Sequence, residues 1–311
     1  MRGGDGAVWP AVVVASAVLL LFSTGGAAIK ATDLSGIQVA CLRSGIAALA
    51  LPAMIPGARK GWSRRTWAVG VAFAVTLILF VQANKLTTAA NSIFLQSTAP
   101  LYLLLLGPVL LREPIRRRDL TFMGVVAAGM ALVFVSVEEP RATATSPALG
   151  NGMALLSGVG WALTVADLRW LARSSEADGA AAAAAAVAGN AIAFAACLPA
   201  VALEPGVPAG DWPVIVYLGV IQIGLAYVFL ARAVRHVGAP LEASLVLVVE
   251  PSLSPVWAWA VHGEAPGGLA LAGGGLILGA TLIRTLREGL RPRTAPVAAP
   301  PPARAAGVGG E

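Results

Sequence analysis

The chain has 311 residues, of which 57% are apolar before its 35 glycines are counted, and only 12% are charged. Soluble domains carry about 25% charged residues and roughly 45–50% apolar residues even with glycine included. The composition and the mean hydropathy of +0.78 therefore argue against a soluble domain. The net charge of +6 arises from basic residues between apolar runs, whereas a nucleic-acid interface needs them clustered on one exposed face.

Ten apolar stretches are long enough to cross ~30 Å of hydrocarbon. They are predicted at 9–29, 35–55, 67–84, 88–110, 119–137, 147–170, 178–203, 212–232, 239–261 and 266–286. These runs are rich in Ala and Leu and lack the alternating period of a membrane β-barrel. The sequence therefore predicts an all-α integral membrane protein with ten transmembrane helices.

The distribution of basic residues indicates the orientation of the spans, because Lys and Arg are biased toward cytoplasmic loops. If the N-terminus (1–8) is cytoplasmic, the inside segments and helix ends hold 18 of the 22 Lys and Arg residues. The outside keeps Lys30, Lys85 and Arg141, and Arg43 lies within the second span. We therefore expect both termini in the cytoplasm, with the Pro- and Ala-rich segment 287–311 as a disordered tail.

Two parts of the chain share a pattern that indicates an internal repeat. Residues 98–124 and 249–275 both carry Pro-x12-Glu-x10-Gly, at a constant offset of 151. We predict two five-helix repeats, at 9–137 and 147–286, joined by an outer linker at 138–146. Because five is odd, the second repeat enters the membrane from the opposite side, and such inverted repeats are characteristic of secondary transporters.

The chain also resembles a known family. The matching stretches are LTTAANSIFLQSTAPLYLLLLGPVLLREPIRRRDLTFMGVVAAGMALVF and LGVIQIGLAYVFLARAVRHVGAPLEASLVLVVEPSLSPVWAWAVHGEAPGGLALAGGGLILGA. They are similar to the drug/metabolite transporter superfamily with two EamA-type domains, over roughly residues 10–287. The resemblance implies a ten-helix transporter in a bacterial cytoplasmic (inner) membrane that works without ATP hydrolysis. It favours export of amino acids, related metabolites or drugs.

We therefore expect a secondary transporter that moves a small-molecule substrate across the lipid bilayer by alternating access. A membrane channel, sensor or scaffold is the alternative. No residue selects the substrate, the direction of transport or the oligomeric state. Protons are a candidate coupling ion, and nucleic acid is not expected as a partner.

Glu250 is the foremost candidate site residue, because charge inside a membrane is costly and usually faces a bundle interior or a water cavity. It lies midway along the ninth span, directly before Pro251. Two interpretations stay open: a structural carboxyl in a kinked helix, or a cavity carboxyl that binds a cation or takes up a proton. Ser254 and Trp257 follow at helical spacing and share its face.

Further polar and aromatic residues lie deep in other spans. One face of the fourth span carries Asn91, Thr98 and Tyr102. Two explanations stay open for this polar face: interhelical hydrogen bonds or a substrate cavity. Trp161 in the sixth span is either a packing residue or a ring that stacks on a ligand. The predicted substrate-cavity residues are Asn91, Thr98, Tyr102, Trp161, Gln222, Tyr227 and Glu250.

Three other charged residues have structural interpretations beside functional ones. Glu113 and Glu264 occupy equivalent helix ends, where a carboxylate can accept hydrogen bonds from the N–H groups that start the next helix. Gating is the alternative for this pair. Arg43 is expected to be paired or to snorkel toward the outer interface, with binding of an anionic group as the alternative.

The sequence lacks the combinations that an enzyme needs. His236 and His262 are predicted on opposite sides of the membrane, so they cannot share a metal site. The chain has no GxxxxGK[ST] loop for a nucleotide, and the glycines at 273–275 are typical of close helix packing. Cys41 and Cys197 lie inside apolar runs. We therefore expect no enzymatic activity, no cofactor and no metal.

Overall fold

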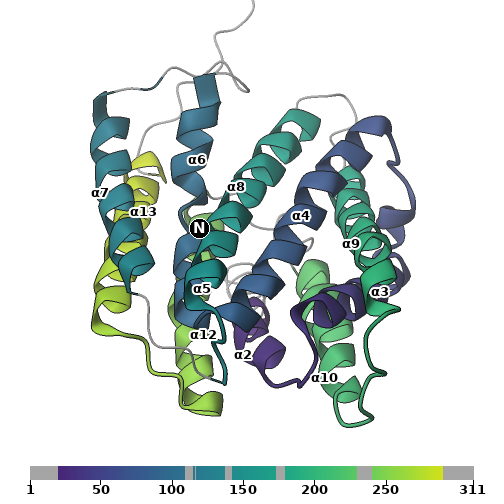
Figure 1. Cartoon of the computed structure of the whole chain (residues 1–311). Coiled ribbons are helices and arrows are strands. Elements are labelled where there is room, and N and C mark those ends of the chain that lie inside the picture. Colours follow the sequence, from purple (N-terminus) through teal and green to yellow (C-terminus); the bar gives the residue numbers. More distant parts are fainter. Residues whose placement is uncertain are drawn as a thin grey trace, which may run out of the picture.

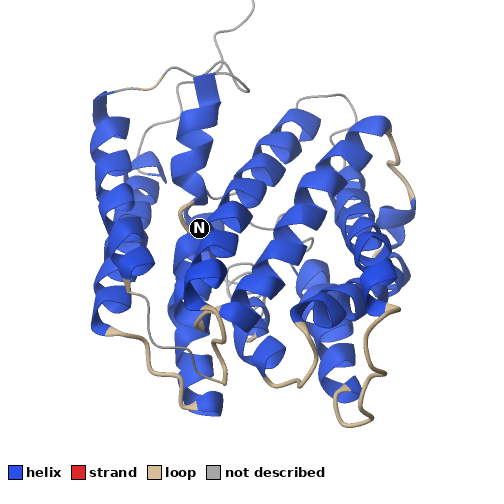
Figure 2. Cartoon of the chain, viewed as in Figure 1, coloured by secondary structure: helices blue, strands red, loops and turns tan. Residues whose placement is uncertain are grey.

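The computed structural model describes residues 20–108, 115, 117–136, 142–172, 179–229 and 240–289. This part of the chain consists of helices joined by loops and contains no β-strand, as Figure 2 shows. In chain order the elements are α2 (Gly25–Lys30), α3 (Gly36–Met54), the 3-10 helix η1 (Pro56–Arg59), α4 (Arg64–Leu86), α5 (Ala89–Gln96), α6 (Ala99–Leu106), α7 (Arg117–Val135), α8 (Pro147–Ala172), α9 (Gly179–Val201), α10 (Trp212–Val216), the π-helix η3 (Tyr217–Leu225), α12 (Pro240–His262) and α13 (Gly268–Gly289). The predicted all-α class is confirmed.

Seven helical segments among the described residues are long and apolar enough to cross a membrane. They are Gly36–Met54, Arg64–Leu86, Ala89–Leu106, Pro147–Leu168, Ala180–Val201, Trp212–Phe229 and Gly268–Arg287. Their positions match predicted spans two to four, six to eight and ten. The first predicted span begins outside the described residues, and the apolar helix Asp119–Val135 is shorter than the others. The helix α12, at the ninth predicted span, is not among the seven. The protein is thus a multi-pass helical membrane protein, while ten spans stay a prediction.

Short polar residues set the points at which three of the spans begin. The hydroxyls of Ser35 and Ser63 each accept a hydrogen bond of 3.1 Å from the backbone N–H three residues later. Thr88 does the same for α5, with Asn91 N donating at 3.1 Å. These side chains satisfy N–H groups that have no partner inside the helix.

The fourth predicted span, 88–110, is not one continuous helix, because α5 and α6 are separated by a turn. Pro100 explains the break, since proline has no N–H and its ring clashes with the carbonyl four residues earlier, here that of Gln96. The Thr98 hydroxyl and backbone N–H both donate to the Leu95 carbonyl, at 2.6 and 3.3 Å. The prediction of one unbroken helical face is therefore corrected, because Asn91 lies in α5, Tyr102 in α6 and Thr98 in the turn between them.

The two halves of the chain pack through closely approaching helices. Figure 1 shows α7 beside α13 on one side of the bundle, and α3, α4 and α9 together on the other. A Cβ atom on Gly129 of α7 would lie 2.7 Å from the Gly273 carbonyl oxygen of α13, and one on Gly273 would lie 2.5 Å from that of Gly129. The predicted packing role of the glycines at 273–275 is confirmed for Gly273.

Gly273→Ala is expected to destabilise the fold, because its methyl group would overlap the Gly129 carbonyl. Overpacking typically costs about 1–3 kcal/mol of unfolding free energy. The melting temperature in detergent measures the effect. Gly275→Ala is the matched control on the same helix, since no atom lies within 4 Å of its Cβ position. Equal melting temperatures for the two variants would contradict the close contact.

Candidate functional site

The first span is interrupted at Thr24, between helical residues 20–23 and α2. Side chains from α12 and η3 reach this interruption. Trp257 Nε1 donates to Ser23 Oγ at 3.0 Å, and Thr24 Oγ1 shares a hydrogen bond of 2.7 Å with the Tyr217 hydroxyl. The break in the first span is thus hydrogen-bonded to both the eighth and the ninth predicted spans.

Two glycines directly after the interruption let other spans approach the first span closely. A Cβ on Gly25 would lie 2.9 Å from Gln222 Nε2. One on Gly26 would lie 3.0 Å from Asn84 Oδ1 and 3.1 Å from Ser254 Oγ. Glycine is needed here for its lack of a side chain, because any larger residue would push these three polar groups apart. We call residues 23–26 the first-span hub.

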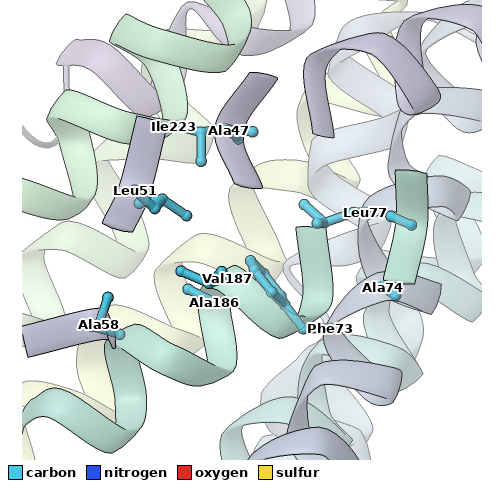
Figure 3. Packing of buried hydrophobic residues seen from close by; sticks show 11 residues of the cluster. Ala47, Leu51, Ala58, Phe73, Ala74, Leu77, Ala186, Val187 and Ile223 are labelled. Atoms are coloured by element: carbon cyan, nitrogen blue, oxygen red, sulfur yellow. The ribbon is translucent and has the colours of Figure 1, made fainter. Parts of the chain in front are cut away.

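Four aromatic rings from four spans meet beside the hub, and we call them the aromatic cluster. The ring centroids of Phe22 and Tyr227 are 5.8 Å apart, and those of Phe73 lie 6.3 Å from Trp161 and 6.2 Å from Tyr227. Phe73 is also part of an apolar cluster with Val187 of α9, which Figure 3 shows from close by. Two predicted site residues, Trp161 and Tyr227, are therefore brought together around a ring that the sequence did not single out.

Glu250 lies on α12, half-buried and close enough to Tyr227 for the two side chains to interact electrostatically. Ser254 and Trp257, which the sequence places on the same helical face, contact the hub at Gly26 and Ser23. The face that carries Glu250 thus packs toward the first span. A carboxyl beside aromatic rings at the meeting of both halves can hold a proton or a cation.

The eighth span is π-helical over Tyr217–Leu225. Gln222 lies in this segment, is 7% exposed, and its Oε1 atom has no donor within the described residues. Short π-helical segments are rare and are frequently found at functional sites. The sequence predicted Gln222 as a site residue because it is polar and lies in the middle of a span, but no sequence pattern indicated the π-helix.

The polar stripe predicted on the fourth span is divided between several neighbours. Asn91 Nδ2 donates to the Ser136 carbonyl at 3.2 Å and to Asn151 Oδ1 at 3.3 Å. The Tyr102 hydroxyl donates to Met130 Sδ at 3.6 Å. These contacts connect the fourth span to α7, to the residue after α7 and to α8. They fit the interpretation that the stripe forms interhelical hydrogen bonds. A substrate role for the stripe stays a prediction.

A buried ion pair joins the two halves at the end of the bundle that the sequence predicts to face outward. Lys30 Nζ lies 3.0 Å from Glu264 Oε2, and the two side chains are 1% and 2% exposed. The ammonium also donates to the carbonyl oxygens of Thr87, at 2.8 Å, and Thr143. Glu264 Oε1 accepts a hydrogen bond from the Ala89 backbone N–H. We call Lys30 and Glu264 the outer ion pair.

The partner of Glu264 differs from the expected one. Its carboxylate does cap a helix, but the N–H of Ala89 begins α5 in the other half, not the next helix along the chain. Gly263 accounts for the difference, because its φ of +66° turns the chain sharply where α12 ends. Left-handed φ values at helix ends favour glycine. The equivalent Glu113 lies outside the described residues.

Sequence reasoning missed the role of Lys30, although a signal was present. Lys30 and Lys85 are two of the few basic residues predicted outside, against the usual bias. Lys85 Nζ donates to the Thr32 carbonyl at 2.6 Å and to Thr32 Oγ1 at 3.1 Å, while Lys30 reaches Thr87. Each lysine therefore binds the loop next to the other, which gives both a structural role at this end of the bundle.

Metal or covalent chemistry gains no support from the remaining reactive side chains. His262 Nε2 lies 2.8 Å from the Ala27 carbonyl oxygen, and His236 is outside the described residues. Across the described ranges, no three His, Cys, Asp or Glu side chains form a group that could hold a metal ion. Cys41 and Cys197 are both buried and form no disulfide.

The fold and the meeting of both halves at the hub define a multi-pass helical membrane protein with an internal repeat. The model of the EamA-like transporter family matches residues 9–135 and 148–286. The chain belongs to this family and is a membrane transporter of the drug/metabolite type.

Solved structures support the same fold. One chain, titled only "Crystal structure of protein", has a TM-score of 0.58 and 20% identity, and the match covers 89% of this chain and 98% of that one. At this identity the likeness shows the fold alone. The sequence has no match among curated proteins.

Glu264→Gln is expected to destabilise the protein strongly, because it leaves the buried Lys30 ammonium without its counter-charge. Breaking one side of a buried pair typically costs about 3–5 kcal/mol. Thermal unfolding in detergent measures the loss, and adding Lys30→Met should restore part of it. Glu204→Gln is the control, because Glu204 accepts a bond from Ser35 in an exposed position. Similar losses for the two glutamines would show that the burial of the pair does not matter.

Proposed function

We propose that the protein is a secondary transporter that moves small metabolites, either amino acids and related compounds or drugs, out of the cell across the cytoplasmic membrane. Its halves, 9–137 and 147–286, are two inverted five-helix repeats with ten spans in all, and both termini lie in the cytoplasm. Access to a site between the repeats alternates between the two sides. Neither ATP nor a cofactor takes part.

The observation that carries this proposal is the position of Glu250. The carboxyl is half-buried and within electrostatic range of Tyr227 of the aromatic cluster, whose rings come from both halves. A charge at such a depth is costly, so the group holds a proton or pairs with a cation. Proton binding at Glu250 and substrate binding at the neighbouring rings would couple solute movement to the pH gradient.

The outer ion pair fits a transporter whose outer side is closed in this conformation. Lys30 and Glu264 connect the first span to the ninth–tenth turn, and their further hydrogen bonds reach Thr87, Ala89 and Thr143. When the transporter opens toward the outside, these groups either have to separate or have to move as one unit. The pair would then favour the outward-closed conformation.

Glu250→Gln is expected to abolish transport driven by a pH gradient, because the amide cannot exchange a proton. A gradient of one pH unit supplies about 1.4 kcal/mol per proton, or about tenfold accumulation of substrate. Flux of labelled amino acids and of aromatic or cationic drugs into proteoliposomes measures it, with and without the gradient. Solute exchange without a gradient should persist in the variant.

Asp33→Asn, a substitution of an exposed carboxyl on the outer side, serves as the matched control and should keep the response to the gradient. Flux that ignores pH and survives Glu250→Gln would make the protein a uniporter with a structural Glu250. Absence of flux for every solute would contradict transport and favour a sensor or scaffold.

Trp161→Ala is expected to raise the KM for transport about tenfold while Trp161→Phe raises it less. Contacts of a ring with an aromatic or cationic ligand contribute about 0.5–2 kcal/mol, and 1.4 kcal/mol is tenfold. Concentration-dependent flux gives the KM. Trp259→Ala is the control, since Trp259 is 60% exposed on the bundle surface. An unchanged KM in Trp161→Ala would assign Trp161 to packing.

A further inference from the structure

Arg43 lies in the interior of the bundle, two turns into α3. Its side chain is 2% exposed. Val39 and Ala47, one turn before and one turn after it, lie on the same helical face. Val39 belongs to an apolar cluster that includes Ile29 and Val81, and Ala47 belongs to the cluster of Phe73. Arg43 therefore projects from α3 at a point between two separate apolar clusters.

The Arg43 guanidinium has no partner in the part of the chain that the structure describes. Its Nε atom is buried without an acceptor, and the side chain forms no ion pair there. Within the described residues we find neither an acidic partner for Arg43 nor the exposure that snorkelling would give it, so its expected roles stay predictions. A guanidinium keeps its charge and its five N–H donors under all physiological conditions. An uncompensated charge of this kind is among the most costly features that a membrane protein can hold.

A second polar side chain with an unpartnered atom, Gln222 Oε1, lies between the same two apolar clusters. Gln222 is flanked along η3 by Leu218, which belongs to the cluster of Val39, and by Ile223, which belongs to the cluster of Phe73. α3 and η3 are in close contact at this depth, since a Cβ on Gly219 would lie 3.0 Å from the Arg43 carbonyl oxygen. Arg43 of α3 and Gln222 of η3 thus lie on adjacent helices, at a level of the bundle that we call the polar layer.

We propose that Arg43 binds the carboxylate of the transported substrate, which makes the substrate a small organic acid with an apolar body. The planar guanidinium can donate two parallel hydrogen bonds to a carboxylate, and the Gln222 amide can add a third. The body of the acid packs against the aromatic cluster, of which Phe73 borders the same layer. This inference rests on the proposed transport function and specifies its substrate class.

The charge balance favours a carboxylate over a phosphate ester. One guanidinium neutralises one negative charge, whereas a phosphate monoester carries close to two at neutral pH. Lys30 and Lys85, which follow the first and third spans, donate hydrogen bonds to the carbonyl oxygens of Thr87 and Thr32 instead. The polar layer thus offers a single positive charge, which matches a monocarboxylate.

The test uses the full-length purified protein and a panel of monocarboxylates with aliphatic and aromatic bodies, each beside its uncharged amide. At least one acid should raise the melting temperature of the unmodified protein, while its amide should not. In Arg43→Met this ligand-induced shift should disappear. The melting temperature without ligand should rise in the same variant, because a buried charge without a counter-charge has been removed. Arg43→Lys should retain part of the shift.

Arg64→Met is the matched control, because Arg64 is exposed at the start of α4, and it should behave as the unmodified protein. The proposal is overturned if no acid of the panel shifts the melting temperature, if amides shift it equally, or if Arg43→Met lowers stability and still binds the acid. Proteoliposome flux separates this outcome from failure of the proposed function. Flux of solutes without a carboxylate, unaffected by Arg43→Met, refutes only the substrate class, whereas acid binding without any flux refutes transport.

Discussion

The buried pair of Lys30 and Glu264 determines how the bundle is assembled at the end that is predicted to face outward. Two opposite charges at 1% and 2% exposure are stable together only when their remaining hydrogen-bonding groups are also satisfied. Carbonyl oxygens of Thr87 and Thr143 bind the Lys30 ammonium, the N–H of Ala89 binds Glu264 Oε1, and Glu264 Oε2 has the ion pair alone in the described part of the chain. The ends of several spans from both halves therefore have to converge on one point, which brings the first span against α12 and η3.

Three charged side chains inside the bundle differ in how the chain compensates them. Lys30 has a counter-charge and carbonyl partners, so its burial stabilises one arrangement of the outer loops. Arg43 Nε has no partner among the described residues, and Glu250 interacts electrostatically with Tyr227. A charge that the chain satisfies by itself is structural. One that it leaves unsatisfied costs stability, and binding of a ligand or proton offsets that cost.

Hydropathy predicted most of the helices, but not their interruptions. Spans two, three, seven and ten match the structure closely because burial in lipid depends on the summed apolarity of about twenty consecutive residues. Pro100 stands at the break in the fourth span, where its missing N–H weakens the helix. Proline alone does not predict such a break, because continuous helices contain Pro52, Pro199, Pro251 and Pro255. The π-helix at Tyr217–Leu225 has no comparable signal, because it depends on the helices packed around it.

The sequence by itself determined the helical membrane class, the internal repeat and the helical face shared by Glu250, Ser254 and Trp257. All of these follow from local composition and spacing. Only the tertiary structure decided which helices those faces meet. Ala89 and Glu264 are 175 residues apart, yet they are hydrogen-bonded, and the aromatic cluster draws its rings from four separate spans. Periodicity identifies the buried side of a helix, whereas its partners depend on close packing of the whole bundle.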